Sequence, residues 1–218
     1  MILEAKNITK SYGNLSILGG VNLEVRKKEI VSIVGSSGAG KTTLLQILGT
    51  LDDASSGELT IDNTNPFELN PKELSSFRNQ KLGFIFQFHQ LLPEFTAIEN
   101  VMLPGLIRGD AKRKAKERAE LLLKRIGLQD RLNHKPSELS GGEQQRAAVC
   151  RALFNQPKII FGDEPSGNLD TRNSQELHEL FFELREEFNQ TFVIVTHNKE
   201  LAAMADRTLT MKDGNFVL

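Results

Sequence analysis

The sequence is short of the residues and runs that mark disulfide-stapled, secreted or membrane-spanning proteins. Its one cysteine, Cys150, excludes an internal disulfide framework and fits a reducing compartment. Because Cys150 lies among alanine and leucine residues, we expect it to pack in the core rather than to act in catalysis. No apolar run reaches the roughly 18 to 20 residues that span a bilayer, and the N-terminus lacks the pattern of a secretion signal. We therefore expect that the chain does not cross a membrane by itself.

An excess of charge of one sign is also missing. The 27 lysine and arginine residues and 28 aspartate and glutamate residues leave a net charge of −1. This balance gives no general electrostatic reason to expect nucleic acid as a partner. Apolar residues at 39% and charged residues at 25% are ordinary globular values, and 218 residues suffice for a proper core.

What the sequence does contain is a glycine-rich loop between a buried strand and a helix. Residues 30–34 are mostly apolar and β-branched, and an apolar periodic segment follows the loop, as in a P-loop. Glycines let successive backbone N–H groups turn inward as a nest for an anion, capped by the positive end of the helix. The candidate nucleotide-binding residues are Gly35, Ser36, Ser37, Gly38, Ala39, Gly40, Lys41, Thr42 and Thr43.

Two side chains at the end of this loop have expected roles of their own. Lys41 is expected to reach the β- and γ-phosphates of a nucleotide, and the Thr42 hydroxyl is placed to bind Mg²⁺. Taken alone, the pattern also fits an ordinary flexible loop before a helix, since it arises by chance in roughly 1% of chains of this length. The rest of the sequence has to decide between the two.

Three further apolar strands end in polar residues. The strands and the residues that follow them are 82–86 with Gln87, 158–162 with Asp163 and Glu164, and 191–196 with His197. Ligands of an open parallel sheet bind beyond the carboxyl ends of its strands, so these side chains are expected near the phosphates. Asp163 is expected to support Mg²⁺, and Glu164, which points elsewhere, to hold the attacking water. The plain alternatives are a strand terminator at Gln87, a solvated turn at Asp163 and Glu164, and a structural histidine.

A second candidate anion site opens a helix that is expected to run to about residue 155. Ser140 and Glu143 have the spacing of a capping box. A cap alone does not need Gly141 and Gly142, because each glycine is disfavoured by roughly 1 kcal/mol relative to alanine inside a helix. The bare N–H groups and the serine hydroxyl suit an anion that approaches closely.

The remaining segments complete the expected architecture. Residues 2–8 and 15–25 alternate apolar and polar side chains, which indicates antiparallel strands. Tyr12, the only tyrosine, lies in the turn between them and either packs on its own sheet or stacks on a base. Further elements are expected as a strand at 58–61, helices at 71–79, 111–126 and from 171 to about 188, and a hairpin at 211–218.

Charged and titratable residues outside these motifs are given plain interpretations. His178 is expected on the surface of its helix, and His89 and His134 lack metal-ligand partners at useful spacing. The basic run at 112–118 is expected to be a solvated outer face, with a weak attraction to anionic lipid as the alternative.

Taken together, these motifs resemble one family over essentially the whole chain, the ATP-binding subunits of ABC transporters. Residues 35–42 match its Walker A motif, 159–163 its Walker B motif, and 139–144 the signature motif found only in this family. The resemblance implies that Tyr12 stacks on adenine and that Asp170 belongs to the D-loop. It implies the catalytic residues Glu164, His197, Gln87 and Lys41, and the Mg²⁺ ligands Thr42, Gln87 and Asp163.

The resemblance also implies a fold and an assembly. The fold is the α/β P-loop NTPase, with a mostly parallel core sheet, an N-terminal antiparallel β subdomain and an inserted helical subdomain. Residues 1–218 would form one domain, with 1–87 and 157–218 as the core and 88–156 as the inserted helices. ATP would bind between two copies of the chain, with Ser140, Gly141 and Gly142 facing the nucleotide of the partner.

Within the family, residues 86–100 look most like the ATPases of lipoprotein-releasing systems. Macrolide exporters and a cell-division ATPase with slow hydrolysis are the alternatives, because they share the Gly-Asn-Leu-Asp loop at 167–170. The segment Phe88–Phe95 would contact two integral membrane permease subunits at the cytoplasmic face of the inner membrane, with no nucleic acid as partner. Two positions depart from the family pattern. Gly162 lies in the apolar Walker B block and changes no charge, whereas Thr50 replaces a glycine that is common after the P-loop helix and has no functional explanation in the sequence.

Overall fold

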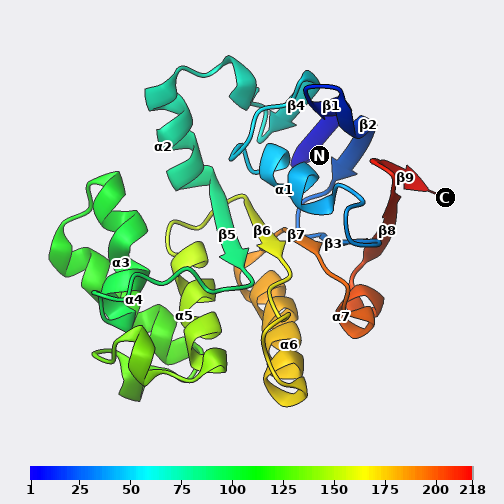
Figure 1. The fold of residues 1–218 in the computed structure, drawn as a ribbon. Helices are drawn as coiled ribbons and strands as arrows, with labels where there is room; N and C mark the ends of the chain where they lie inside the picture. The colour runs from blue at the N-terminus through cyan, green and yellow to red at the C-terminus, as the bar shows by residue number, and fades with distance from the viewer. Residues whose placement is uncertain (218) are drawn as a thin grey trace.

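The structure is a computed structural model that describes residues 1–217, and it contains two β-sheets (Figure 1). The smaller sheet is antiparallel, with the order β2-β1-β4. Its strands are β1 (Leu3–Tyr12), β2 (Leu15–Val25) and β4 (Ser56–Ile61). Leu3 and Ala5 of β1 are buried against the core, as the alternating pattern predicts.

The larger sheet has six strands in the order β5-β6-β7-β3-β8-β9, and only β9 runs antiparallel. The strands are β3 (Ile30–Val34), β5 (Leu82–Phe86), β6 (Ile159–Asp163), β7 (Phe192–Val195), β8 (Arg207–Lys212) and β9 (Asn215–Val217). The register pairs Asp163 with Phe86 on one side and with Val195 on the other, and Val195 with Ile33. The carboxyl ends of four neighbouring strands therefore lie level at one edge of the sheet.

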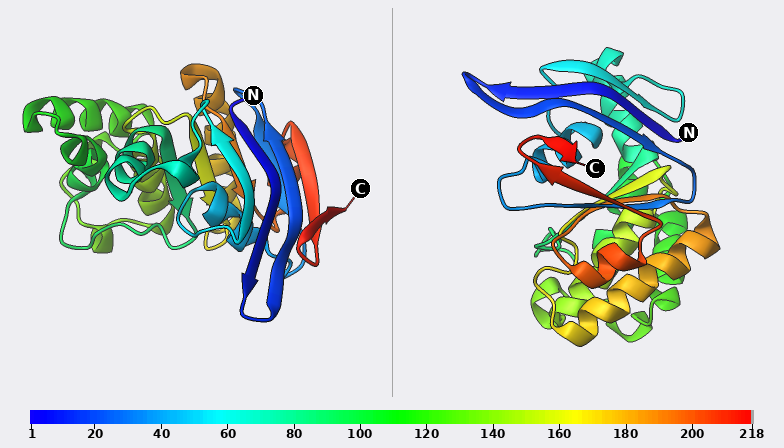
Figure 2. Two further views of the ribbon diagram at one scale, coloured as in Figure 1. Left: turned by 90° about the horizontal axis from the view of Figure 1, so that it is seen from above. Right: turned by 90° about the vertical axis from the view of Figure 1, so that its right-hand side faces the viewer.

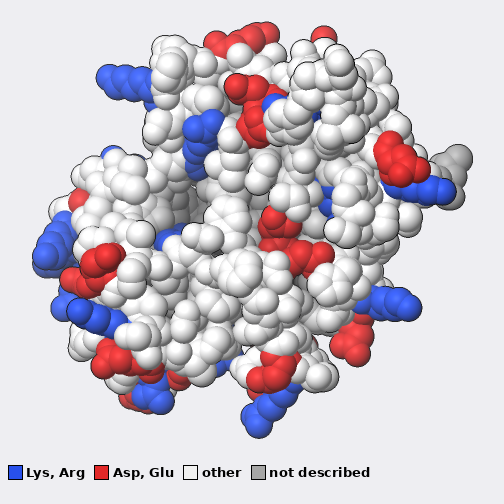
Figure 3. Space-filling model, in the orientation of Figure 1, with Lys and Arg blue, Asp and Glu red and all other residues white. Residues whose placement is uncertain are grey.

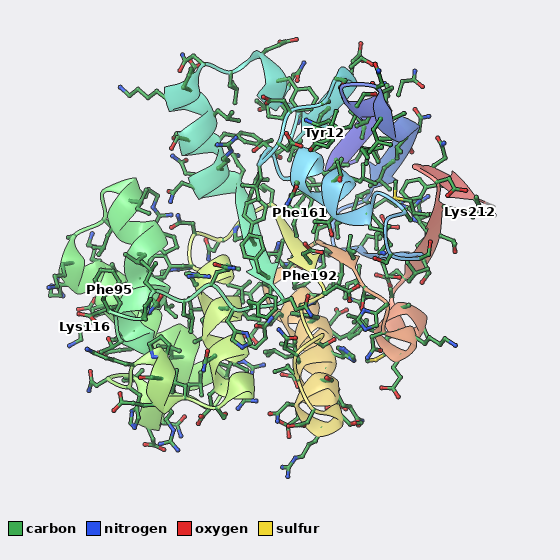
Figure 4. All side chains as sticks on the ribbon, viewed as in Figure 1. Tyr12, Phe95, Lys116, Phe161, Phe192 and Lys212 are labelled. Atoms are coloured by element: carbon green, nitrogen blue, oxygen red, sulfur yellow. The ribbon has the colours of Figure 1, made fainter. Side chains whose placement is uncertain are left out.

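Helices cover both faces of the larger sheet. Helix α1 (Lys41–Leu48) lies between the two sheets and buries its apolar side. Helices α5 (Gly141–Leu153), α6 (Thr171–Phe188) and α7 (Lys199–Met204) cover the other face (Figure 2). Phe161 of β6 belongs to the core beneath α1, whereas Phe192 of β7 belongs to the core beneath α6 (Figure 4). The strands β5, β6, β7 and β3 are thus buried on both sides, which fits their continuous apolar sequences.

A third core holds a group of helices at the end of the molecule farthest from the small sheet (Figure 2). Helices α3 (Ala97–Arg108) and α4 (Lys112–Arg125) pack there on α5, and α2 (Pro71–Lys81) leads into β5. Short 3₁₀ turns lie at 66–68, 129–131 and 136–138. Cys150 is fully buried in this third core, and burial raises the pKa of its thiol. Its prediction as a core residue is confirmed.

The expected fold class is confirmed, and most of the expected strands and helices are present. Strand β1 runs on through Tyr12, so this residue ends a strand and the turn itself is Gly13-Asn14. The C-terminal hairpin is formed by β8 and β9, and Leu218 lies outside the described residues. Helices α3 and α7 were not predicted; α3 contains Pro104, which argues against a helix in the sequence.

The prediction that His178 lies on the surface is wrong. The loop after β6 folds back over α6, and the His178 ring is buried with 1% of its surface exposed. Its Nε2 lies 3.0 Å from the Ser166 hydroxyl. Burial lowers the pKa of His178, so the neutral ring is favoured.

The basic run on α4 is a solvated face for most of its length. Lys112, Arg113, Lys114 and Lys116 are exposed, and Figure 4 shows Lys116 at the outer side of the helices. Arg118 differs, because its guanidinium lies 5.5 Å from the centre of the Phe154 ring and donates to the Phe154 carbonyl. The expected outer face therefore ends at Arg118, which covers the third core.

Thr50 takes a backbone conformation that usually favours glycine. Its φ is 60°, in the left-handed region, at the end of the turn after α1. Arg78 of α2 donates to both the hydroxyl and the carbonyl of Thr50. The departure from glycine at this position is thus accompanied by a side-chain contact that glycine cannot offer.

Among residues 1–217, no helix combines the length and the apolar character that a bilayer crossing requires.

Candidate active site

The glycine-rich loop joins β3 to α1 in the conformation that an anion nest requires. Gly40 caps α1 with φ 97°, and Gly38 has φ 80° with open space where a side chain would begin. Gly35 is needed for a different reason, because a Cβ there would lie 2.2 Å from the Met211 carbonyl oxygen. The loop therefore packs tightly against β8 on one side and leaves its other side free for a ligand.

The Lys41 ammonium lies across this loop. Its Nζ donates to the carbonyls of Gly35 and Ser36, each at 2.9 Å. A positive charge is therefore held over the same concave surface as the loop N–H groups and the N-terminus of α1. This combination is suited to a chain of phosphates.

A cavity of about 520 Å³ opens beside the loop and receives side chains from three other strand ends. It is lined by Ile17, Gly35, Ser37, Gly38, Gly40, Lys41, Thr42, Thr43, Gln87, Glu164, Val195 and His197. The structure thus brings Gln87, Glu164 and His197 together with the P-loop, as their positions after parallel strands predict. Ile17 was not predicted, because an apolar residue on an edge strand carries no chemical signal.

Thr42 and Asp163 meet beneath this cavity. The Thr42 hydroxyl donates to Asp163 Oδ1 at 3.2 Å. Burial raises the pKa of Asp163, the hydrogen bond from Thr42 lowers it, and the charge of Glu164 raises it further. A half-buried carboxylate whose charge is disfavoured, next to a hydroxyl oxygen, fits a hard divalent cation.

These two oxygens would be only part of such a cation's ligand shell. Residues 1–217 contain no group of three or more His, Cys, Asp or Glu side chains that could hold a metal ion alone. Mg²⁺ usually takes one or two protein ligands and completes its shell with water and phosphate oxygens. The residues present therefore fit Mg²⁺ bound together with a nucleotide.

Glu164 and His197 form a pair at the mouth of the cavity. Glu164 Oε2 accepts a hydrogen bond from the His197 backbone N–H at 3.1 Å and lies 2.9 Å from His197 Nδ1. Glu164 has φ 46°, a left-handed conformation that is costly for this residue type. The backbone strain and the contact with His197 together fix the direction of the carboxylate.

Gln87 is held by an amide that sequence reasoning missed. Its Nε2 donates to Asn168 Oδ1, and Asn168 Nδ2 donates back to the Gln87 carbonyl, both at 3.1 Å. Asn168 lies in the loop before Asp170, whose carboxylate caps α6 and accepts from the Asn173 amide. A single asparagine in a loop carries no pattern that would have identified this role.

The second candidate anion site does not share this cavity. Ser140 caps α5, and it forms the predicted capping box with Glu143. Ser140 and Gly141 are exposed, and neither lines the P-loop cavity. A Cβ on Gly142 would lie 2.2 Å from Asn173 Oδ1, so a larger residue here would require the Asn173 side chain to move. A Cβ on Gly141 would meet only the Leu169 side chain, at an ordinary contact distance of 3.7 Å.

Tyr12 also lies apart from the residues that line the cavity. Its hydroxyl donates to Asp52 at 2.7 Å, which raises the pKa of the phenol. Lys10, which pairs with Asp52 at 2.8 Å, lies 4.8 Å from the centre of the ring. The side chain is still 54% exposed, so part of the ring remains free for contact.

Comparison with known proteins agrees with this geometry. The family described as ABC transporter matches residues 18–167. Two similar relatives are lipoprotein-releasing system ATP-binding proteins LolD. That of Bacteroides fragilis is 58% identical over 216 residues, covering 99% of this chain and 100% of the relative. That of Porphyromonas gingivalis is 61% identical over 214 residues, covering 98% of each.

A solved structure gives the same result at the level of the fold. It is an ATP-binding cassette, described as a dimer in a post-hydrolysis state bound to ADP and Pi. It matches with a TM-score of 0.90 and 40% sequence identity, over 99% of this chain and 97% of that chain. The sequence and structural matches span nearly the full length of the protein, and the chain therefore belongs to the ABC transporter family, as one of its ATP-binding cassettes.

Proposed function

We propose that the protein hydrolyses ATP to power a membrane transporter that releases lipoproteins from the inner membrane toward the outer membrane. The observation that carries the ATPase part is the single cavity that joins the P-loop to Glu164, His197 and Gln87. The lipoprotein part rests on the printed names of the full-length relatives. It is also supported by the sequence of residues 86–100.

The residues of the cavity divide into binding and catalytic groups. Loop N–H groups and Lys41 bind the β- and γ-phosphates. Thr42, Gln87 and Asp163 would hold Mg²⁺, which supplies positive charge against the phosphate oxygens when it is bound. Glu164 orients the attacking water and accepts its proton, and His197 holds the Glu164 carboxylate in place and faces the γ-phosphate.

Replacing the proposed base should separate binding from hydrolysis. Glu164→Gln keeps the size of the side chain but cannot accept the water proton, so turnover should fall by about 10² to 10⁴-fold. ATP binding should stay close to that of the wild type, because the phosphate-binding groups are unchanged. Steady-state ATPase assays and equilibrium ATP binding check this, and near-normal turnover would remove Glu164 from the proposed role.

If Asp163 binds Mg²⁺, its carboxylate should lower the stability of the protein without nucleotide and strengthen the binding of ATP with Mg²⁺. The pKa of Asp163 is raised in the folded state, so its contribution to stability is present at low pH and is lost as pH rises from about 4 through the raised pKa. Asp163→Asn should therefore be at least as stable as the wild type without nucleotide at pH 7.5, with the difference shrinking toward pH 4. Thermal unfolding at both pH values measures this.

The same variant should lose most of its stabilisation by ATP and Mg²⁺, because a ligand stabilises only as strongly as it binds. Thermal unfolding with both ligands present provides that second reading. A wild type more stable than Asp163→Asn at every pH without nucleotide would contradict the buried-charge argument.

Stacking of Tyr12 on adenine can be measured by intrinsic fluorescence, since the chain has one tyrosine and no tryptophan. ATP should change the tyrosine fluorescence in a saturable way, whereas inorganic tripolyphosphate, which has no base, should not. Tyr12→Ala should weaken ATP binding by about ten-fold and Tyr12→Phe much less, because stacking needs the ring and not the hydroxyl. Unchanged fluorescence at saturating ATP would exclude the stacking.

A second copy of the chain would complete the site. Ser140, Gly141 and Gly142 lie outside the P-loop cavity of their own chain, and the exposed helix start at Ser140 suits the γ-phosphate held by a partner. The proposed active unit is a homodimer with two composite ATP sites. The solved dimeric cassette with the same fold supports this arrangement.

Two permease subunits would bind near Phe88–Phe95. This segment exposes Phe88, Leu92 and Phe95, and a cavity of about 420 Å³ lined mainly by apolar residues of α2, β5, α3 and α5 lies close by in the fold. Figure 3 shows the molecular face hollowed between α2 and α3. We place the protein at the cytoplasmic face of the inner membrane, bound to permeases and not to nucleic acid.

Purification from membranes tests the partner. The tagged full chain should bring down two integral membrane subunits from detergent-solubilised membranes, and Phe95→Asp should lose most of them. Leu121→Asp, at a leucine that is 70% exposed on α4, is the matched control and should keep them. Recovery of ribosomes or DNA in place of permeases would overturn the transport function.

A further inference from the structure

Gln145 is a buried glutamine that the catalytic groups described above do not include. It lies on α5, five residues after Ser140, and none of its surface is exposed. Its Nε2 donates to the Pro165 carbonyl at 2.6 Å and to the Phe86 carbonyl at 3.2 Å. One side chain thus joins two loops that are far apart in the sequence.

Each of these carbonyls lies next to a residue of the active site. Phe86 directly precedes Gln87, and Pro165 directly follows Glu164. The two strands concerned, β5 and β6, are neighbours, but beyond Asp163 the sheet pairing has ended. Past that point, Gln145 is a direct link between the backbone leading to Gln87 and the backbone leaving Glu164.

The other end of the Gln145 amide contacts His89. Because Nε2 faces two carbonyls, Oε1 must face the ring, so His89 Nδ1 carries the proton and donates. His89 and Gln90 have φ values of 53° each, two successive non-glycine residues in the left-handed region. Such a segment persists only when its surroundings hold it in place.

A second residue of α5 holds the same segment. The Arg151 guanidinium donates to the His89 carbonyl at 2.8 Å and to the Gln90 carbonyl at 2.5 Å. Helix α5 therefore begins after Ser140 and holds the chain beyond Gln87 at two points along its length. Gln145 bonds the His89 ring, and Arg151 bonds the His89 and Gln90 carbonyls. The strained segment and the Glu164 loop are both fixed to the same rigid element.

We propose that Gln145 is a positioning residue for ATP hydrolysis: it holds Gln87 and Glu164 at a fixed spacing by tying both loops to α5. The inference rests on the proposed function of the site. A shift of about 1 Å in a catalytic group can cost 10²-fold in rate. Loss of Gln145 should therefore lower kcat without weakening ATP binding, since its contacts are made to backbone and not to the phosphate-binding loop.

The test uses the full chain with ATP and Mg²⁺ and compares two buried glutamines. Gln145→Ala should lower kcat by about 10- to 100-fold while the Kd for ATP stays within about two-fold. Gln190→Ala removes a glutamine that is only 3% exposed and bonds the neighbouring Thr191 carbonyl, outside the cavity. It controls for the loss of a buried amide and should keep its kcat.

Further variants keep the test decisive if Gln145→Ala does not fold. Gln145→Met keeps the length of the side chain without its hydrogen bonds, and His89→Ala removes only the partner of Oε1. Both should lower kcat, His89→Ala by less, and His89→Ala combined with Gln145→Ala should be no worse than Gln145→Ala alone. A fall in kcat no larger than that of Gln190→Ala, or an equal loss of ATP binding, would overturn the proposal.

Glu164→Gln, measured in parallel, separates this inference from the function on which it rests. If Glu164→Gln still hydrolyses ATP normally, the assigned base is wrong whatever Gln145→Ala shows. If Glu164→Gln is inactive and Gln145→Ala is normal, only the positioning role fails.

Discussion

The level register of the parallel strands is the constraint on which the site depends. Asp163 pairs with Phe86 on one side and with Val195 on the other, so the residues that follow three strands emerge at one height beside the P-loop. A slip of one residue in this pairing would turn each tip toward the opposite face of the sheet. Burial of the sheet between two layers fixes that register, because the strands β5, β6, β7 and β3 have apolar side chains on both faces. The packing that stabilises the core therefore also sets the geometry of the site.

The helical group built on α5 adds a second level of organisation. Its start carries the exposed Ser140, and Gly142 packs against the Asn173 side chain, which donates a hydrogen bond to Asp170. Gln145 and Arg151 then fix the chain that leads from Gln87 to the exposed apolar residues near Phe95. A rigid-body shift of α5 would therefore move Ser140, the loops that carry Gln87 and Glu164, and the segment Phe88–Phe95, which we propose as the permease contact, together.

The sequence was informative wherever chemistry is local. The P-loop and the polar residues after each strand follow from glycine spacing and strand pattern, and the structure places Gln87, Glu164 and His197 in one cavity with Lys41. Contacts between distant segments were not predictable, because no local pattern encodes them. The loop folded over His178, the close approach of Asn173 to Gly142, and the amides of Asn168 and Gln145 are of this kind. Tyr12 shows the same limit, since its anchor Asp52 is 40 residues away.

The central claim is that each ATP site is built from two chains, and mixing two inactive variants tests it most directly. Lys41→Ala disables the P-loop half of a site, and Ser140→Arg disables the half that the other chain supplies. Both sites of each mutant homodimer are therefore incomplete. A heterodimer of the two keeps one intact site, formed by Lys41 of one chain and Ser140 of the other. Equal mixing with free subunit exchange should restore about a quarter of wild-type ATPase activity, since half of the dimers would carry one working site of two. No recovery in a sample with demonstrated heterodimers, or full activity of Ser140→Arg alone, would contradict the composite site.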